Sequence, residues 1–111
     1  MKLRRARPRV LLVDDDPVFV GFVCAKESQL GVSLDVSAAG RDALSRIESS
    51  MWAGVLLDLD LPDVSGLDVL RTMRAKKRLV PVVVLTGAAD VATAVEAMKL
   101  GALACFIHQV L

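Results

Sequence analysis

Short apolar runs alternate with amphipathic stretches along the whole chain. Residues 9–13, 32–38, 54–57, 80–85 and 103–107 have the length and the aliphatic content of strands. The first run, RVLLV, is almost continuously apolar, as is typical of a strand that is covered on both faces of its sheet. The pattern therefore predicts five short strands separated by longer, mixed segments.

The segments between these runs carry helix signals. Asp16 can cap a first helix, which we expect to cover residues 17–30. A second helix is expected over residues 41–49, a third beginning near Leu67, and a fourth capped by Asp90. Strands that alternate with single helices form a parallel sheet, because each crossover needs the length of a helix. The predicted class is α/β.

Composition indicates one cytoplasmic domain. With 111 residues, 54% of them hydrophobic, the chain can fill a single core. We expect residues 1–111 to form that domain, with residues 1–8 as a basic leader. Lys+Arg 14 against Asp+Glu 13 give a net charge of +1, and no basic helix is present, so direct nucleic-acid binding is not expected. No apolar stretch approaches the ~18 residues of a membrane span, and the aspartates after the first strand exclude a signal peptide.

Cys24 and Cys105 each lie inside an apolar segment. Neither a paired spacing nor neighbouring histidines indicate a disulfide or a metal site. We therefore expect buried, reduced thiols.

Acidic residues and a hydroxyl follow the ends of three predicted strands. Asp14 and Asp15 follow the first, Asp58 follows the third, and Thr86 follows the fourth. Ligands of open α/β sheets bind at the carboxyl ends of the strands. Clustered carboxylates repel one another unless a cation is bound, hard oxygen donors suit Mg²⁺, and a carboxylate beside that ion can act as a nucleophile toward a phosphoryl group. Taken singly, each residue is explained as well by a helix cap, a turn or a strand-end hydroxyl.

Four motifs, in order, resemble one known family. They are VLLVDDDP at residues 10–17, DLDLPDVSGL at 58–67, PVVVLTG at 81–87 and AVEAMKLGA at 94–102. Together they resemble the receiver domain of two-component response regulators, and the last motif resembles the transcription-regulating members especially.

The resemblance implies a flavodoxin-like, doubly wound five-stranded parallel sheet with strand order 2-1-3-4-5. It also implies that Asp58 is the phosphoacceptor, and that Mg²⁺ is held by Asp15, Asp58 and the backbone carbonyl of Asp60, with Asp14 acting through water. Thr86 would be the switch hydroxyl that moves toward the phosphoryl group. The implied phosphoryl donor is a sensor histidine kinase, and the chain would be a signalling module rather than an enzyme.

The end of the chain departs from the family's pattern. His108 stands at the position of the usual lysine, Gln109 at that of the following proline, and Cys105 at that of the aromatic switch residue. Because histidine is mostly neutral at neutral pH, His108 is either a weaker phosphoryl contact or a plain strand-end residue. Phe106 should point to the opposite face of the strand, so it should not replace the missing aromatic.

The family's fifth helix, after the last strand, is predicted to be missing. The first helix is itself apolar around most of its circumference, through Val18, Phe19, Val20, Phe22, Val23 and Cys24. An exposed apolar patch of this kind usually meets a partner. We expect either a fragment of a longer regulator or a homodimer formed through the first helix and the uncovered sheet face.

Three functions remain open at this point. The first is a phosphorylation-dependent switch. The second is a degenerate receiver that acts by phosphorylation-independent protein contact, which the residues at 105 and 108 favour. The third is a Mg²⁺-dependent aspartyl phosphohydrolase, because Asp58-Leu59-Asp60 fits an Asp-x-Asp nucleophile motif.

Overall fold

The computed structural model describes residues 6–87 and 90–107, which form a single five-stranded parallel sheet flanked by helices. The strand order is β2-β1-β3-β4-β5, which confirms the predicted order and fold class. The elements in chain order are β1 (Arg9–Val13), α1 (Pro17–Cys24), α2 (Glu27–Leu30), β2 (Ser33–Ser37), α3 (Gly40–Ser49), β3 (Gly54–Leu57), α4 (Gly66–Ala75), β4 (Val82–Thr86), α5 (Val91–Lys99) and β5 (Ala104–Ile107).

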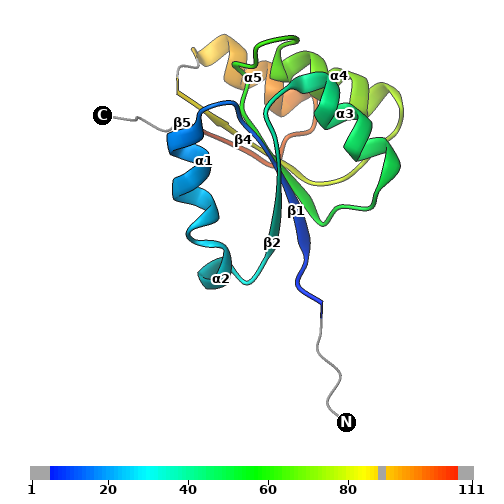
Figure 1. Ribbon diagram of the computed structural model, residues 1–111. Helices are drawn as coiled ribbons and strands as arrows, with labels where there is room; N and C mark the ends of the chain where they lie inside the picture. Colours follow the sequence, from blue (N-terminus) through cyan, green and yellow to red (C-terminus); the bar gives the residue numbers. More distant parts are fainter. Residues whose placement is uncertain (1–5, 88–89, 108–111) are drawn as a thin grey trace.

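The helices lie on opposite sides of the sheet (Figure 1). α1 and α2 lie on one side, and α3, α4 and α5 lie on the other, with α4 packed between its two neighbours. No helix in the described part of the chain is long and apolar enough to cross a membrane.

The prediction of one continuous helix over residues 17–30 is wrong, because the structure divides it into α1 and α2. The backbone tightens at the junction, where the N–H of Lys26 donates to the carbonyl of Val23, three residues back, at 2.9 Å. α2 ends at Gly31, whose φ of 69° lies in the left-handed region that glycine adopts without strain. α5 is consequently the fourth helix of the predicted pattern, and residues 108–111 lie outside the described residues.

The hydrophobic core lies between the sheet and the layer of α3, α4 and α5. Along β4, buried Val82 and Val84 alternate with half-buried Val83 and Leu85. The helices contribute Ala43, Ile47, Val69, Leu70, Met73 and Ala97 to this core.

The opposite face of the sheet is covered less completely by the described residues. α1 has no buried residue, and its Val18 and Phe22 side chains are 69% and 62% exposed. Cys24 and Cys105 are free thiols, as predicted, but each is only half-buried. Incomplete cover on this side explains why Cys24, which lies on α1, is not enclosed.

Candidate functional site

Two neighbouring strand ends bring acidic side chains to one edge of the sheet. Val13 of β1 is paired with Leu57 of β3, so the next residues, Asp14 and Asp58, leave the sheet at the same level. The N–H of Asp58 donates to the carbonyl of Val13 at 2.8 Å, which continues the strand pairing. One carboxylate oxygen from each of Asp14, Asp15 and Asp58 lies within 4.8 Å of the other two. The structure therefore brings together the three carboxylates that follow the first and third strands.

The turn after β1 is organised by its own carboxylates. Asp14 Oδ1 accepts the backbone N–H of Asp16 at 2.9 Å. Asp16 Oδ1 accepts the N–H of Val18 at 3.0 Å and so caps α1 as predicted. Asp14 is only 2% exposed, whereas Asp15 is exposed, so Asp15 is the more accessible of the two adjacent carboxylates.

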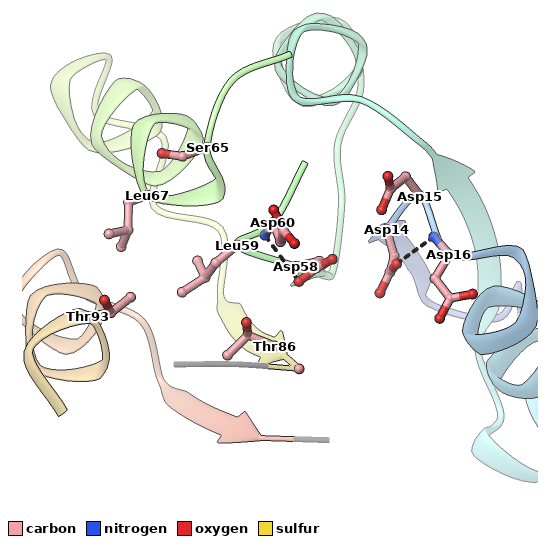
Figure 2. A pocket seen from close by; sticks show the side chains of 11 residues that line it. Asp14, Asp15, Asp16, Asp58, Leu59, Asp60, Ser65, Leu67, Thr86 and Thr93 are labelled. Carbon is pink, nitrogen blue, oxygen red and sulfur yellow. Dashed lines mark hydrogen bonds between the residues drawn. The ribbon is translucent and has the colours of Figure 1, made fainter. Parts of the chain in front are cut away.

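The acidic cluster opens into a cleft of about 500 Å³ (Figure 2). Figure 2 shows Asp58 between the aspartates of the β1 turn on one side and Ser65 and Thr93 on the other, with Thr86 at the end of β4. The lining residues are Asp14, Asp15, Asp16, Asp58, Leu59, Asp60, Ser65, Leu67, Thr86, Gly87 and Thr93. The predicted site residues that the structure describes thus all line one cleft.

The loop that follows Asp58 folds back onto its own start. Gly66 begins α4 so close to this start that a Cβ there would lie 2.3 Å from the carbonyl oxygen of Asp58 and 2.7 Å from the Cα of Leu59. The N–H of Gly66 donates to the carbonyl of Leu59 at 3.0 Å, and Ser65 caps α4 by accepting the N–H of Asp68. Glycine at position 66 is therefore needed for close backbone approach, not only for a turn.

The donor set of the cleft fits a hard divalent cation. Asp14 and Asp58 are 2% and 8% exposed, so water screens their mutual repulsion poorly. Asp60 lies on the same loop and lines the cleft, and its N–H donates to Asp58 Oδ1 at 3.3 Å. Several oxygen donors beside an open cleft with room for water are what Mg²⁺ prefers.

Sequence reasoning missed two hydroxyls of this cleft, Ser65 and Thr93. Ser65 precedes Asp68 by three residues, and this helix-start pattern could have indicated it. Thr93 carries no local signal, because it reaches the cleft only through the placement of α5.

Three predictions concern the last strand. Cys105 packs against the core, while Phe106 is 57% exposed and pairs with Leu85 on the other face, as predicted. His108 lies outside the described residues, so its predicted contact stays a prediction.

A carboxylate near the cleft, Asp63, has a large pKa shift. Its oxygens accept the backbone N–H groups of Arg41 and Gly40 at 2.9 and 2.7 Å. These bonds favour the charged form and lower the pKa of Asp63 from 3.8 to about 2.

This shift predicts an acid-dependent contribution to stability. A carboxyl group whose pKa is lowered by folding stabilises the protein above its unfolded value of 3.8, and that contribution is lost as the pH falls toward 2. The difference in melting temperature between the parent and Asp63→Asn should therefore be largest near neutral pH and shrink between pH about 4 and about 2. Thermal melts across this range measure it, and a difference that does not change with pH would contradict the assignment.

Comparison with known sequences agrees with this arrangement. The model of the response regulator receiver domain matches residues 10–109. Over 94 residues the chain is 35% identical to the transcriptional regulatory protein QseB of Escherichia coli O157:H7, which covers 85% of this chain and 43% of that protein. The chain thus spans less than half the length of that relative.

Solved structures share the fold. A response regulator protein from Burkholderia pseudomallei with a phosphorylated aspartic acid, a calcium ion and citrate is 27% identical, with a TM-score of 0.82 over 94% of this chain and 61% of that chain. The receiver domain of the sensor histidine kinase PA1611 from Pseudomonas aeruginosa PAO1, with a magnesium ion coordinated in its active-site cleft, is also 27% identical, with a TM-score of 0.83 over 96% of this chain and 88% of that chain.

Proposed function

The chain belongs to the response regulator receiver domain family of two-component systems, and on this basis we propose that it is a phosphorylation-dependent switch whose phosphoacceptor is Asp58. The observation that carries the proposal is the cluster of Asp14, Asp15 and Asp58, each of which offers one oxygen within 4.8 Å of the other two beside an open cleft. The phosphorylated aspartic acid of the similar Burkholderia pseudomallei protein supports it.

In the proposed reaction, a carboxylate oxygen of Asp58 attacks the phosphorus of a phosphohistidine on a sensor histidine kinase. A new P–O bond gives an acyl phosphate while the P–N bond breaks, and the imidazole nitrogen leaves with the electron pair. Attack by water later releases inorganic phosphate and restores the carboxylate. The phosphoryl transfer and the hydrolysis would both take place in the cytoplasm.

The proposed Mg²⁺ site uses Asp15, Asp58 and the backbone carbonyl of Asp60, with Asp14 acting through water. The bound ion would offset the negative charge that develops on the phosphoryl oxygens. The magnesium ion of the similar Pseudomonas aeruginosa receiver supports this choice of metal. Asp14 is buried and holds the Asp16 N–H, so it would also fix the turn that presents Asp15.

Thr86 is proposed to detect the phosphoryl group. It is the last residue of β4, 1% exposed, and its side chain lines the cleft. A hydroxyl that donates to a phosphoryl oxygen would link the chemistry at Asp58 to the start of the β4–α5 connection. His108 is proposed as a second, weaker contact at the position of the family's lysine.

A receiver that acts without phosphorylation is the second candidate, and Cys105 is the observation that favours it. Cys105 takes the place of the aromatic switch residue and packs against the core, while Phe106 lies on the other face of β5. No ring at position 105 is then available to follow a movement of Thr86. This candidate predicts no adduct on Asp58, whereas a phosphohydrolase would release phosphate from its donor in many turnovers.

We also propose that the 111-residue chain forms a homodimer through the sheet face that carries α1. Val18 and Phe22 on α1 are 69% and 62% exposed, and Phe106 on the edge strand β5 is 57% exposed. Leu56 and Val83 are paired across β3 and β4 and are half-buried on the face opposite the main core. A second copy would remove this apolar surface from water.

Introducing a charge at the proposed interface should separate the dimer. Phe22→Asp is expected to give a monomer, because a carboxylate buried in an apolar contact is strongly unfavourable. Leu79→Asp is the matched control: Leu79 is 80% exposed and lies in the connection before β4, outside α1 and the sheet, so this variant should remain dimeric. Light scattering after gel filtration measures both. A parent that is monomeric at its highest attainable concentration would contradict the interface.

A further inference from the structure

The N-terminus of α3 is capped by a residue from a distant loop. Ala39 occupies the N-cap position of α3 and makes no side-chain cap hydrogen bond. Asp63 takes over this role, since its two carboxylate oxygens accept the N–H of Gly40 at 2.7 Å and that of Arg41 at 2.9 Å. Asp63 belongs to the loop between β3 and α4 that begins at Asp58.

The contact between this loop and α3 is also sterically close. A Cβ at Gly40 would lie 2.4 Å from Val64 Cγ2 and 3.3 Å from the carbonyl oxygen of Val64. The other end of the loop is held where Gly66 lies against the carbonyl oxygen of Asp58. The loop therefore has two anchors, one on its own start and one on the N-terminus of α3.

We propose that Asp63 is a positioning residue for the phosphoacceptor site, which holds the β3–α4 loop through α3 so that Asp58 and the Asp60 carbonyl keep their places in the cleft. The chemical part of this inference rests on the proposed function. Asp63 is not among the described residues that line the cleft, so it acts through the loop rather than on the phosphoryl group. The two hydrogen bonds of Asp63 are strong for a surface residue, because both join a charged acceptor to the positive end of a helix.

A pair of variants separates positioning from simple helix stability. Asp63→Ala removes the cap and the anchor together. Adding Ala39→Ser restores a local cap without the anchor, because Ala39 has the extended backbone of an N-cap, with φ −145° and ψ 148°. A serine hydroxyl there can accept the N–H of Asp42, three residues on. Asp63→Asn, which keeps one acceptor oxygen, serves as a milder variant if Asp63→Ala does not fold.

The parent, Asp63→Ala and the double variant are compared by three measurements. These are the melting temperature, the hydrogen exchange of the amides of residues 58–66, and the rate of adduct formation. The rate is measured over a range of Mg²⁺ and phosphodonor concentrations. We expect Asp63→Ala to lower the melting temperature, to speed exchange in the loop, and to slow adduct formation about tenfold, because small misplacements of reacting groups reduce rates steeply. Ala39→Ser should recover the melting temperature while exchange and rate stay near those of Asp63→Ala.

Recovery of all three quantities by Ala39→Ser would overturn the inference, as would unchanged loop exchange in Asp63→Ala. The exchange measurement needs no phosphorylation. If the parent itself forms no adduct, the proposed function fails, and exchange alone then decides whether Asp63 holds the loop.

Discussion

Asp58→Asn should stabilise the metal-free protein and abolish its response to Mg²⁺. At an effective dielectric constant of about 20, two unit charges about 5 Å apart repel by about 3 kcal/mol. Asp58 is 8% exposed, and one of its oxygens lies within 4.8 Å of one oxygen each of Asp14 and Asp15. Because water on the open side of the cleft screens part of this repulsion, we expect a gain of about 1 to 2 kcal/mol, or about 4 to 9 °C in melting temperature.

Mg²⁺ should reverse the stability order of the parent and Asp58→Asn. A ligand that binds only the folded state raises stability with its concentration, so the parent should gain stability as Mg²⁺ is added while Asp58→Asn should not. Asp60→Asn is the matched control, since it removes a charge from the same loop but keeps the backbone carbonyl that is proposed to bind the ion. Thermal melts over a Mg²⁺ titration test this. Two results would contradict the metal site. One is a melting temperature of Asp58→Asn that rises with Mg²⁺, and the other is a metal-free Asp58→Asn that melts below the parent.

Gly66→Ala should have the largest effect on stability among single-methyl additions to this loop. The new Cβ would lie 2.3 Å from the carbonyl oxygen of Asp58 and 2.7 Å from Leu59 Cα, both backbone atoms that no side-chain rotation can move away. Overpacking of this kind costs about 1 to 3 kcal/mol, and the displaced carbonyl belongs to the phosphoacceptor itself. We expect a loss near the upper end of that range, together with slower adduct formation.

Gly21→Ala provides the control for this substitution. A Cβ at Gly21 in α1 would meet nothing within 4 Å, so the change should be neutral or stabilise the helix by about 0.5 to 1 kcal/mol. Chemical denaturation of both variants beside the parent gives the comparison. Equal stability of Gly66→Ala and the parent would contradict this prediction, because it would show that the backbone can move to make room for the methyl group.

The strands could be predicted because local sequence determines them. RVLLV indicated a strand covered on both faces, and Leu11, Leu12 and Val13 are indeed all buried. Asp14 and Asp58 could be placed together because the family resemblance implied that the first and third strands are neighbours, and neighbouring parallel strands end at the same edge.

What the sequence did not indicate depends on contacts between distant segments. The cap of α3 comes from Asp63, 23 residues from Gly40, so no motif around Ala39 points to it. Thr93 reaches the cleft only because α5 lies beside it. The break at Lys26 is an exception, since it follows from a local tightening of the backbone where the apolar run ends and the polar residues 26–29 begin.

Formation of a phosphoryl adduct on Asp58 decides whether the chain is a phosphorylation-dependent receiver. The chain is incubated with a small phosphodonor, with and without Mg²⁺, quenched rapidly in acid, and analysed by intact mass and by peptide mapping. A receiver with Asp58 as phosphoacceptor should gain one phosphoryl group, dependent on Mg²⁺ and located in the peptide that contains Asp58. Absence of any adduct at every quench time, from a protein that Mg²⁺ nevertheless stabilises, would contradict it and favour a receiver that acts without phosphorylation.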